Sequence, residues 1–552
     1  MFVLQLGPVR EYAYTVPMKK SRFLDPAGMA IAMPAALLLG GACVLPLGWL
    51  LFTLVGSEQV RAELSISSFR LAMLARTLLY GISVAVLATA MAMPAALVLG
   101  RGPWWLRRLL WVVLPAGLLM PSLAYAYGWS QFVRLGREQF AAIGVVFDPA
   151  GFWDVTRCTW TLAGWLWPIP AILVGLNLAR MDVGVQQQAA VDGALWRITL
   201  RQLVAPAAAS LAVVTLLATQ EFAVYEPTGI SVIATEVRMV FETGAFSGLA
   251  NPMTVPLGGQ MTSDQASRAA AAVATGLPLI VVTLALAAVA AWLGVRTSAT
   301  DQVALAQWPR AMNAPLWADI VAVVVMLVML LVPVWSLVVS LRRPLSPSTI
   351  WTEFAPELGG AAMVAGIVVV ACLILALSMS ARWIRGGLVL AGLSFLVGGQ
   401  FLAIAAIRLW NRPGLEWVYD AFPVTVLLYL GRFGWLALIG AWGTWGKGWE
   451  ELRSMAAVDG AGPLRTAMHI VWPVAWPMLL AGALLAGALS LTEVPATVLL
   501  QPSNPQVLTP MLMTWVHMAR YDPMIEASLL MMASIVVPWL VVVLLSVPAK
   551  RR

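Results

Sequence analysis

The sequence predicts an all-α polytopic membrane protein with about twelve transmembrane helices, arranged as two parallel repeats of six. Three observations support this: an apolar composition, long apolar runs along the whole chain, and one loop pattern that occurs twice. Of the 552 residues, 61% are hydrophobic and 11% are charged, and the mean hydropathy is +0.85. These values lie outside the range of soluble domains. The apolar runs lack the alternation of a membrane β-barrel, so we expect helices.

The apolar runs divide the chain into two halves of six predicted spans each. About 20 apolar helical residues cross a bilayer core of about 30 Å. In residues 1–300, the first predicted repeat, the spans are 29–55, 71–99, 109–131, 160–179, 207–225 and 268–294. In residues 301–552, the second repeat, they are 316–340, 358–380, 387–407, 422–445, 474–492 and 525–547. The first run lacks a clear small-residue cleavage site, so we interpret it as a retained helix.

Basic residues predict the orientation of the spans, because loops rich in Lys and Arg remain in the cytoplasm. Lys19, Lys20 and Arg22 precede the first span, and basic residues recur after each even-numbered span. Both termini are therefore expected in the cytoplasm. Arg342 and Arg343, at the end of the seventh predicted span, contradict the pattern because they would lie outside.

Composition argues against several other classes of function. The net charge of +8 comes from short basic clusters beside apolar runs, which indicates topology signals and no nucleic-acid partner. The three cysteines are far apart and odd in number, so neither a disulfide framework nor a metal knuckle is expected. With only two histidines, no metal site, cofactor or catalytic group is predicted.

A seven-residue pattern occurs once in each half. The first copy is Gln188-Ala189-Ala190-Val191-Asp192-Gly193-Ala194, and the second is Met455-Ala456-Ala457-Val458-Asp459-Gly460-Ala461. The offset, 456 minus 189, is 267 residues, and it also pairs Thr199 with Thr466, Pro206 with Pro473 and Glu226 with Glu493. Both copies fall in predicted cytoplasmic loops between the fourth and fifth spans of their halves. The halves are therefore predicted to be parallel, since inverted repeats would place the copies on opposite faces.

Local chemistry predicts the shape of these two repeated loops, 185–206 and 452–473. The alanine pair leaves a small surface that a partner's backbone can approach, and the glycine ends a short helix because it tolerates positive φ. Asp192 and Asp459 are expected to accept hydrogen bonds from the amides that open the next helix. Pro206 and Pro473 are expected where the chain re-enters the membrane.

The repeated loops resemble the EAA loop of ABC importer permeases, and two of them in one chain resemble the fused permeases of the ferric-iron and thiamine importers. In that family the loop forms the helix that couples the permease to its ATPase. Ala189, Ala190 and Gly193 fit the pattern, as do Ala456, Ala457 and Gly460, whereas Gln188 and Met455 replace the usual Glu. The resemblance implies two ATPase subunits, an external solute-binding protein and a multi-pass location in a bacterial inner membrane.

The resemblance also implies a function: import of a solute, with ferric iron as the first choice and thiamine or a polyamine as alternatives. The chain is not expected to be an enzyme. Gly446-Lys447-Gly448 lacks the spacing and hydroxyl of a phosphate-binding loop, so ATP hydrolysis is expected in a separate chain. The rival hypothesis is a proton- or sodium-coupled secondary transporter. It requires carboxylates at mid-membrane depth, and the sequence places none there clearly.

Three ionisable residues are candidates for a translocation pathway. Arg432 falls within the tenth predicted span, where it either lines a polar pathway, pairs with Glu493 or braces the bundle. Glu226 and Glu493 each follow the matched proline by twenty residues (226 minus 206, 493 minus 473), about 30 Å along a helix. They are therefore expected at the external mouth, as cargo or binding-protein contacts or as ordinary solvated residues.

Overall fold

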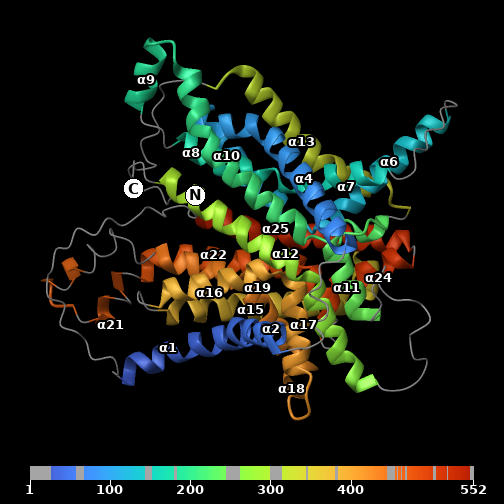
Figure 1. Cartoon of the computed structure of the whole chain (residues 1–552). Helices are drawn as coiled ribbons and strands as arrows, with labels where there is room; N and C mark the ends of the chain where they lie inside the picture. The colour runs from blue at the N-terminus through green and yellow to red at the C-terminus, as the bar shows by residue number, and fades with distance from the viewer. Residues whose placement is uncertain are drawn as a thin grey trace.

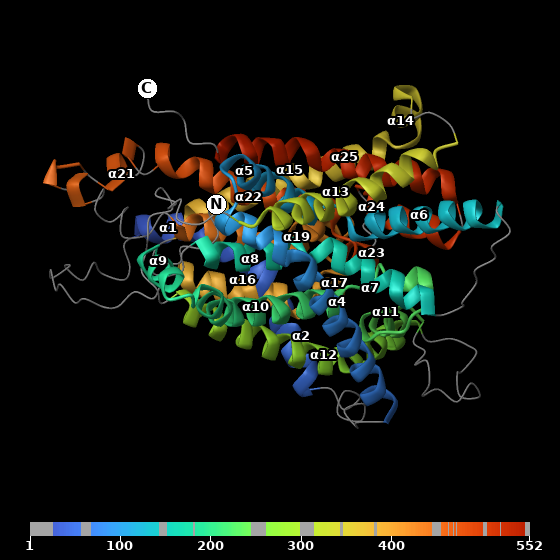
Figure 2. The same ribbon diagram turned by 90° about the horizontal axis from the view of Figure 1, so that it is seen from above.

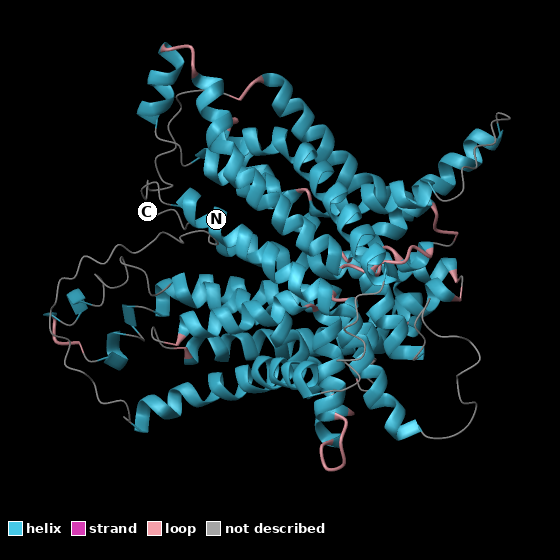
Figure 3. Cartoon of the chain, viewed as in Figure 1, coloured by secondary structure: helices cyan, strands magenta, loops and turns pink. Residues whose placement is uncertain are grey.

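The structure is a computed structural model in which the described part of the chain is helical. It describes residues 26–56, 68–142, 152–179, 183–243, 261–298, 314–342, 346–379, 383–443, 454–456, 458–461, 463–466, 469–470, 472–500, 505–518 and 520–546. Within these ranges there are helices and connecting turns and no strand (Figure 3). The prediction of an all-α chain is confirmed for this part.

In the part of the chain that the structure describes, the candidate spans lie on the twelve predicted apolar runs, nine as single helices and three as bent helix pairs. In the described ranges, nine helices are long and apolar enough to cross a membrane, and three bent helix pairs raise the number to twelve if each pair is one span. The seventh span, Leu316–Val339, lies where it was predicted. Arg342, just beyond it, is exposed and its Nε lies 3.7 Å from Asp522 Oδ1, at the start of the last span. Arg343 lies outside the described residues.

The helices of the first half are α1 (Pro26–Leu39), η1 (Gly40–Val44), α2 (Leu45–Gly56), α4 (Ser68–Arg101), α5 (Trp104–Leu119), α6 (Ser122–Ala142), α7 (Phe152–Leu166), α8 (Pro168–Ala179), α9 (Val183–Val191), α10 (Leu195–Gln220), η2 (Glu226–Thr228), α11 (Ile233–Thr243) and α12 (Met261–Ser298). Those of the second half are α13 (Leu316–Val339), α14 (Pro347–Glu353), α15 (Ala355–Ser378), α16 (Ile384–Val397), α17 (Gly399–Trp410), α18 (Glu416–Tyr419), α19 (Phe422–Gly443), α21 (Pro463–Thr466), α22 (Trp472–Thr492), α23 (Pro495–Leu500), α24 (Leu508–His517) and α25 (Tyr521–Ser546).

The third span of each half is sharply bent. Between α5 and α6 the axis turns by 95°, and between α16 and α17 it turns by 100°. The first break falls at Met120, directly before Pro121, which has no N–H to continue the helix. The Trp165 indole N–H donates to the freed Met120 carbonyl at 2.9 Å. The second break falls at Gly398, whose φ of +101° is strained for other residues.

The first span of each half packs against the other half of the chain. On α1 and η1, Ala35, Leu39 and Cys43 are buried in one core with residues of α15, α19 and α22. On α13, Met329 and Leu337 are buried in a core with α4, α6 and α7. Figure 1 shows α1 beside the second-half helices and α13 beside α4. The two predicted repeats are therefore interlocked.

The two repeated loops lie at the same end of the molecule. Figures 1 and 2 both show α9 and α21 at one side, while α6, α11 and α24 lie at the opposite side. We call these the loop end and the far end. The arrangement agrees with the predicted direction of the spans, since each loop joins the fourth and fifth spans of its half.

Candidate functional site

The first repeated loop closes with a backbone turn centred on Gly193. Helix α9 ends at Val191, and Gly193 adopts φ +65°. The Ala194 N–H donates to the Ala189 carbonyl at 2.8 Å, and the Gly193 N–H donates to the Ala190 carbonyl at 3.2 Å. These two bonds, with a left-handed glycine between them, form a Schellman turn that satisfies the last carbonyls of the helix.

The second repeated loop shows the same turn. Gly460 adopts φ +75°, and the Ala461 N–H donates to the Ala456 carbonyl at 2.9 Å. The predicted role of the two glycines as helix stops is confirmed. Ala457 lies outside the described residues, so its part in the turn is not described.

Each turn buries its first alanine and exposes the valine before the aspartate. Ala189 and Ala456 are 2% and 3% exposed, whereas Val191 and Val458 are 87% and 88% exposed. The buried alanine therefore lies beneath the turn, and its small side chain lets the turn pack closely against the residues below it. The apolar tip is formed by valines that the sequence analysis did not single out, although both are part of the repeated pattern. Gln188 and Met455 are exposed beside these tips.

The predicted capping role of Asp192 is wrong. Helix α10 begins after Ala194, which makes no side-chain cap, while the exposed Asp192 belongs to the preceding turn. The Schellman turn places the aspartate before the glycine, two residues short of the position that could cap α10. Asp459 is likewise exposed and precedes Gly460.

The two loops differ in how they join the next span. In the first, α10 starts directly after the turn, and Pro206 is buried within this one helix. In the second, α21 intervenes before α22, and Pro473 is exposed in the first turn of α22. Thr199 anchors α10 to the end of α4 by accepting a hydrogen bond of 3.1 Å from Arg101 Nη2.

Arg432 forms a buried polar cluster that joins the two halves. Its side chain on α19 lies with Nε 3.6 Å from Glu493 Oε1, and it is buried. Its Nη1 donates to the Phe395 carbonyl at 2.7 Å and to Gln220 Oε1, at the end of α10, at 3.4 Å. The guanidinium carbon also lies 4.7 Å from the centre of the Phe395 ring. Of the alternatives that the sequence left open for Arg432, the structure shows the pairing with Glu493.

In the structure, the residue of the first half that corresponds to Glu493 is Glu221. The match of Glu493 with Glu226, which the constant offset predicted, is therefore wrong. Glu221 directly follows α10 and Glu493 directly follows α22, and both side chains are buried. The Ala223 N–H donates to Glu221 at 3.1 Å, and the Ala496 N–H donates to Glu493 at 3.3 Å. The 267-residue offset does not hold here, because the second half has five more residues between the glycine of its turn and this glutamate. The separation is 493 minus 460 in the second half and 221 minus 193 in the first.

Both glutamates lie at the break of the bent third span of their half. The Ser122 hydroxyl, at the first residue of α6, donates to Glu221 Oε1 at 3.2 Å. At the first residue of α17, a Cβ added to Gly399 would lie 2.6 Å from Glu493 Oε1. Glu493 is therefore buried in the bundle and does not project from the mouth as predicted. If the two halves are aligned on the ends of the fifth and eleventh spans, and not on the repeated loops, Glu493 is matched with Glu221.

Glu226 lies at the far end in a surface network of charges. Its carboxylate pairs with Arg238 on α11, and His517 Nε2 on α24 lies 3.2 Å from Glu226 Oε1. Burial raises the pKa of Glu226, and Arg238 opposes that shift. The network links the outer segments of the two halves, so Glu226 is already engaged by Arg238 and His517 of the chain itself.

Comparisons with known proteins add no family to these observations. The chain matches no protein-family model, and it matches no curated protein. Among the described residues, no group of three or more His, Cys, Asp or Glu side chains is arranged to hold a metal ion. The chain is a polytopic membrane protein, consistent with a transporter.

Proposed function

We propose that the chain is the permease subunit of an ATP-binding-cassette importer, with two parallel six-span repeats similar to a type I importer. The observation that carries the proposal is the pair of matching turns at one end, each with an exposed valine tip. An exposed apolar tip on a rigid turn suits the groove of a partner. The membrane would be a bacterial inner membrane, with the loop end and both termini in the cytoplasm.

In this proposal two separate ATPase subunits each hold one repeated loop. ATP binding favours the closed ATPase pair, which draws the loops together and shifts the bundles from inward-open to outward-open. A solute-binding protein then delivers cargo at the far end. The Arg432 cluster lies between the halves and contacts Gln220 of the first half, so its contacts would rearrange when the halves move.

The first test replaces the valine tips. Val191→Asp together with Val458→Asp should abolish co-purification of the ATPase and ATP-dependent uptake, because a charge would be buried at each contact. Both valines are exposed, so the free energy of unfolding should change little. The matched control is Trp417→Asp, at an exposed apolar residue of α18 that lies outside the repeated loops. Normal uptake by the double variant would refute the proposal.

A second test concerns the side of the membrane. Gln187→Cys and Val458→Cys, at exposed positions of the two loops, should both react with an impermeant thiol reagent only when the cytoplasmic face is accessible. Labelling from opposite faces would exclude parallel repeats and therefore the importer.

A proton- or sodium-coupled secondary transporter remains the alternative, because the structure buries Glu221 and Glu493 next to the breaks of two spans. Buried carboxylates of this kind carry protons in such transporters. In proteoliposomes without ATPase, the alternative predicts uptake driven by a pH gradient and lost in Glu221→Gln. The importer predicts no uptake under these conditions.

A further inference from the structure

A cavity at the far end lies between the two halves of the chain. Its volume is about 300 Å³. The first half contributes residues of α6, α7 and the segment 224–228, and the second half contributes residues of α24, α25 and the turn between them. This size reaches the lower end of the range for small-molecule sites. Its position between the halves means that their relative movement would open or close it.

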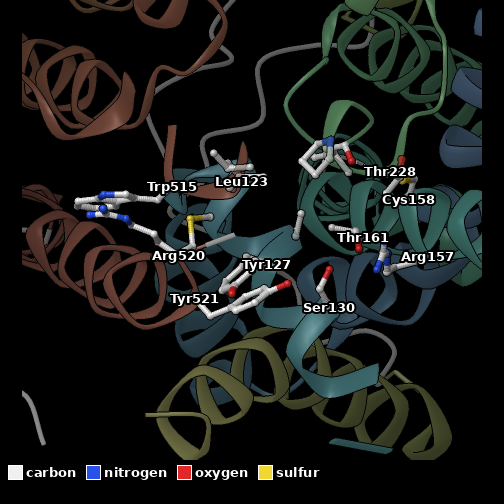
Figure 4. A pocket seen from close by; sticks show the side chains of 15 residues that line it. Leu123, Tyr127, Ser130, Arg157, Cys158, Thr161, Thr228, Trp515, Arg520 and Tyr521 are labelled. Atoms are coloured by element: carbon white, nitrogen blue, oxygen red, sulfur yellow. Dashed lines mark hydrogen bonds between the residues drawn. The ribbon is translucent and has the colours of Figure 1, made fainter. Parts of the chain in front are cut away.

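The walls of the cavity offer cations and hydrogen-bond donors. Among the described residues, two arginines line it, Arg157 from α7 and Arg520 from the turn before α25, and no carboxylate does. Figure 4 shows these arginines on opposite sides, with the Arg520 guanidinium beside Trp515 and with labelled tyrosine, serine and threonine side chains between the two arginines. The hydroxyls belong to Tyr127, Ser130, Thr161, Thr228 and Tyr521. Guanidinium and hydroxyl groups together are the donors that bind oxyanions.

Two acidic residues near the cavity are paired with arginines, and one of these arginines is Arg157 of the cavity wall. Asp154 Oδ1 lies 3.1 Å from Arg157 Nη2, and Asp522 Oδ1 lies 3.7 Å from Arg342 Nε. Glu226 contacts Arg238 and His517, as described above. Arg520 is exposed and has no acidic partner among the described residues. The uncompensated charge at the cavity is therefore positive.

We propose that this cavity is the entry site for an anionic cargo that carries an oxyanion group, either a phosphate or a carboxylate. Arg520 binds the anion, Arg157 faces it from the opposite wall, and the hydroxyls fix its orientation. This inference rests on the proposed importer and narrows its substrate class. A bare ferric ion, thiamine or a polyamine is disfavoured, because each is a cation and would meet the uncompensated charge of Arg520 with no carboxylate among the described lining residues. An anionic iron chelate would fit.

Chemical labelling of Cys158 measures whether a ligand occupies the cavity in the purified permease, without an ATPase. Cys158 lines the cavity with a side chain that is 1% exposed, and Cys43 and Cys372 are buried in a different core. The purified chain is treated with N-ethylmaleimide, and mass spectrometry reads the three cysteines separately. Glycerol 3-phosphate and citrate are the two anionic probes, with glycerol as the neutral control and putrescine as the cationic control. In parallel, the unfolding temperature is measured with the same probes, because a ligand that binds the native state raises it.

We expect one or both anions to protect Cys158 saturably and to raise the unfolding temperature, while Cys43 and Cys372 are unaffected. Protection by glycerol 3-phosphate alone assigns a phosphate, and protection by citrate alone assigns a carboxylate. Arg520→Gln should raise the half-protecting concentration about tenfold or more, the loss expected for one charged hydrogen bond. Arg137→Gln, at an exposed residue of α6 that does not line the cavity, should leave it unchanged.

The inference is overturned if neither anion gives protection or a thermal shift, if putrescine acts equally well, or if Arg520→Gln changes nothing. None of these measurements involves an ATPase. A chain that binds anions but fails the valine-tip test would disprove the importer and keep the site, whereas the reverse result would disprove only the site.

Discussion

Arg432 and Glu493 show how a buried ion pair depends on its surroundings. Removing both charges from water costs several kcal/mol per ion, and a pair offsets this only when further hydrogen bonds complete it. Here the Phe395 carbonyl and Gln220 accept from the guanidinium, and the Ala496 N–H donates to the carboxylate. The Arg432 Nε that faces Glu493 makes no hydrogen bond, so the pair is held by charge and by these bonds at its other atoms. It joins residues that are 61 positions apart (493 minus 432).

Replacing one partner of this pair should lower the free energy of unfolding more than replacing both partners. Arg432→Met leaves the Glu493 carboxylate buried without its cation and should lower the free energy of unfolding by about 3–5 kcal/mol. Arg432→Met with Glu493→Gln should recover part of that loss, because no uncompensated charge remains. Unfolding in detergent monitored by tryptophan fluorescence measures both variants. Equal stability of the two variants would show that the pair is not coupled.

At the scale of elements, close helix contacts depend on glycines with no room for a side chain. On α6, a Cβ at Gly128 would lie 2.6 Å from the Pro333 carbonyl oxygen of α13. The Gly128 carbonyl also accepts a hydrogen bond of 2.6 Å from the Ser336 hydroxyl. Small residues at such contacts let the two backbones approach, which is the main source of association between helices in lipid.

Two glycines of α6 should therefore respond in opposite ways to the same substitution. Gly128→Ala should destabilise the protein by about 1–3 kcal/mol, because the α13 backbone has to move. Gly136→Ala, where a Cβ meets nothing within 4 Å, should be neutral or stabilising by up to about 1 kcal/mol, since alanine favours helix. Thermal unfolding of the two variants compares them directly, and similar losses would contradict this account of the contact.

At the scale of the whole molecule, the first span of each half packs within the other half, and this packing holds the two halves together. Residues of α1 and η1 complete a core of the second half, and residues of α13 complete a core of the first half. Each half on its own would expose an apolar helix face within the bundle. The covalent link between the halves is then less important than their mutual packing.

We expect the two halves to assemble when they are made as separate chains. Residues 1–300 and 301–552 should each aggregate when expressed alone, whereas co-expression should give a stable complex of both. Deleting residues 26–56 from the first chain should weaken that complex, because α15 and α19 lose the helix that covers them. Size-exclusion chromatography in detergent gives the result. Monodisperse, separately stable halves would show that this packing contributes little.

The sequence by itself determined the twelve apolar runs, the common direction of the repeated loops and the glycine stops, because these depend on local composition and backbone chemistry. The tertiary structure decided which side chains meet. It paired Glu493 with Arg432, and it made Glu221 the counterpart of Glu493 in the first half. It packed the first span of each half in the other half, exposed the valine tips and placed Arg157 and Arg520 on opposite sides of one cavity. Such contacts join residues far apart in the chain, and five extra residues in one half are enough to shift a constant offset. Hydropathy predicts that a helix enters the membrane, but only packing decides which face it buries and against which neighbour.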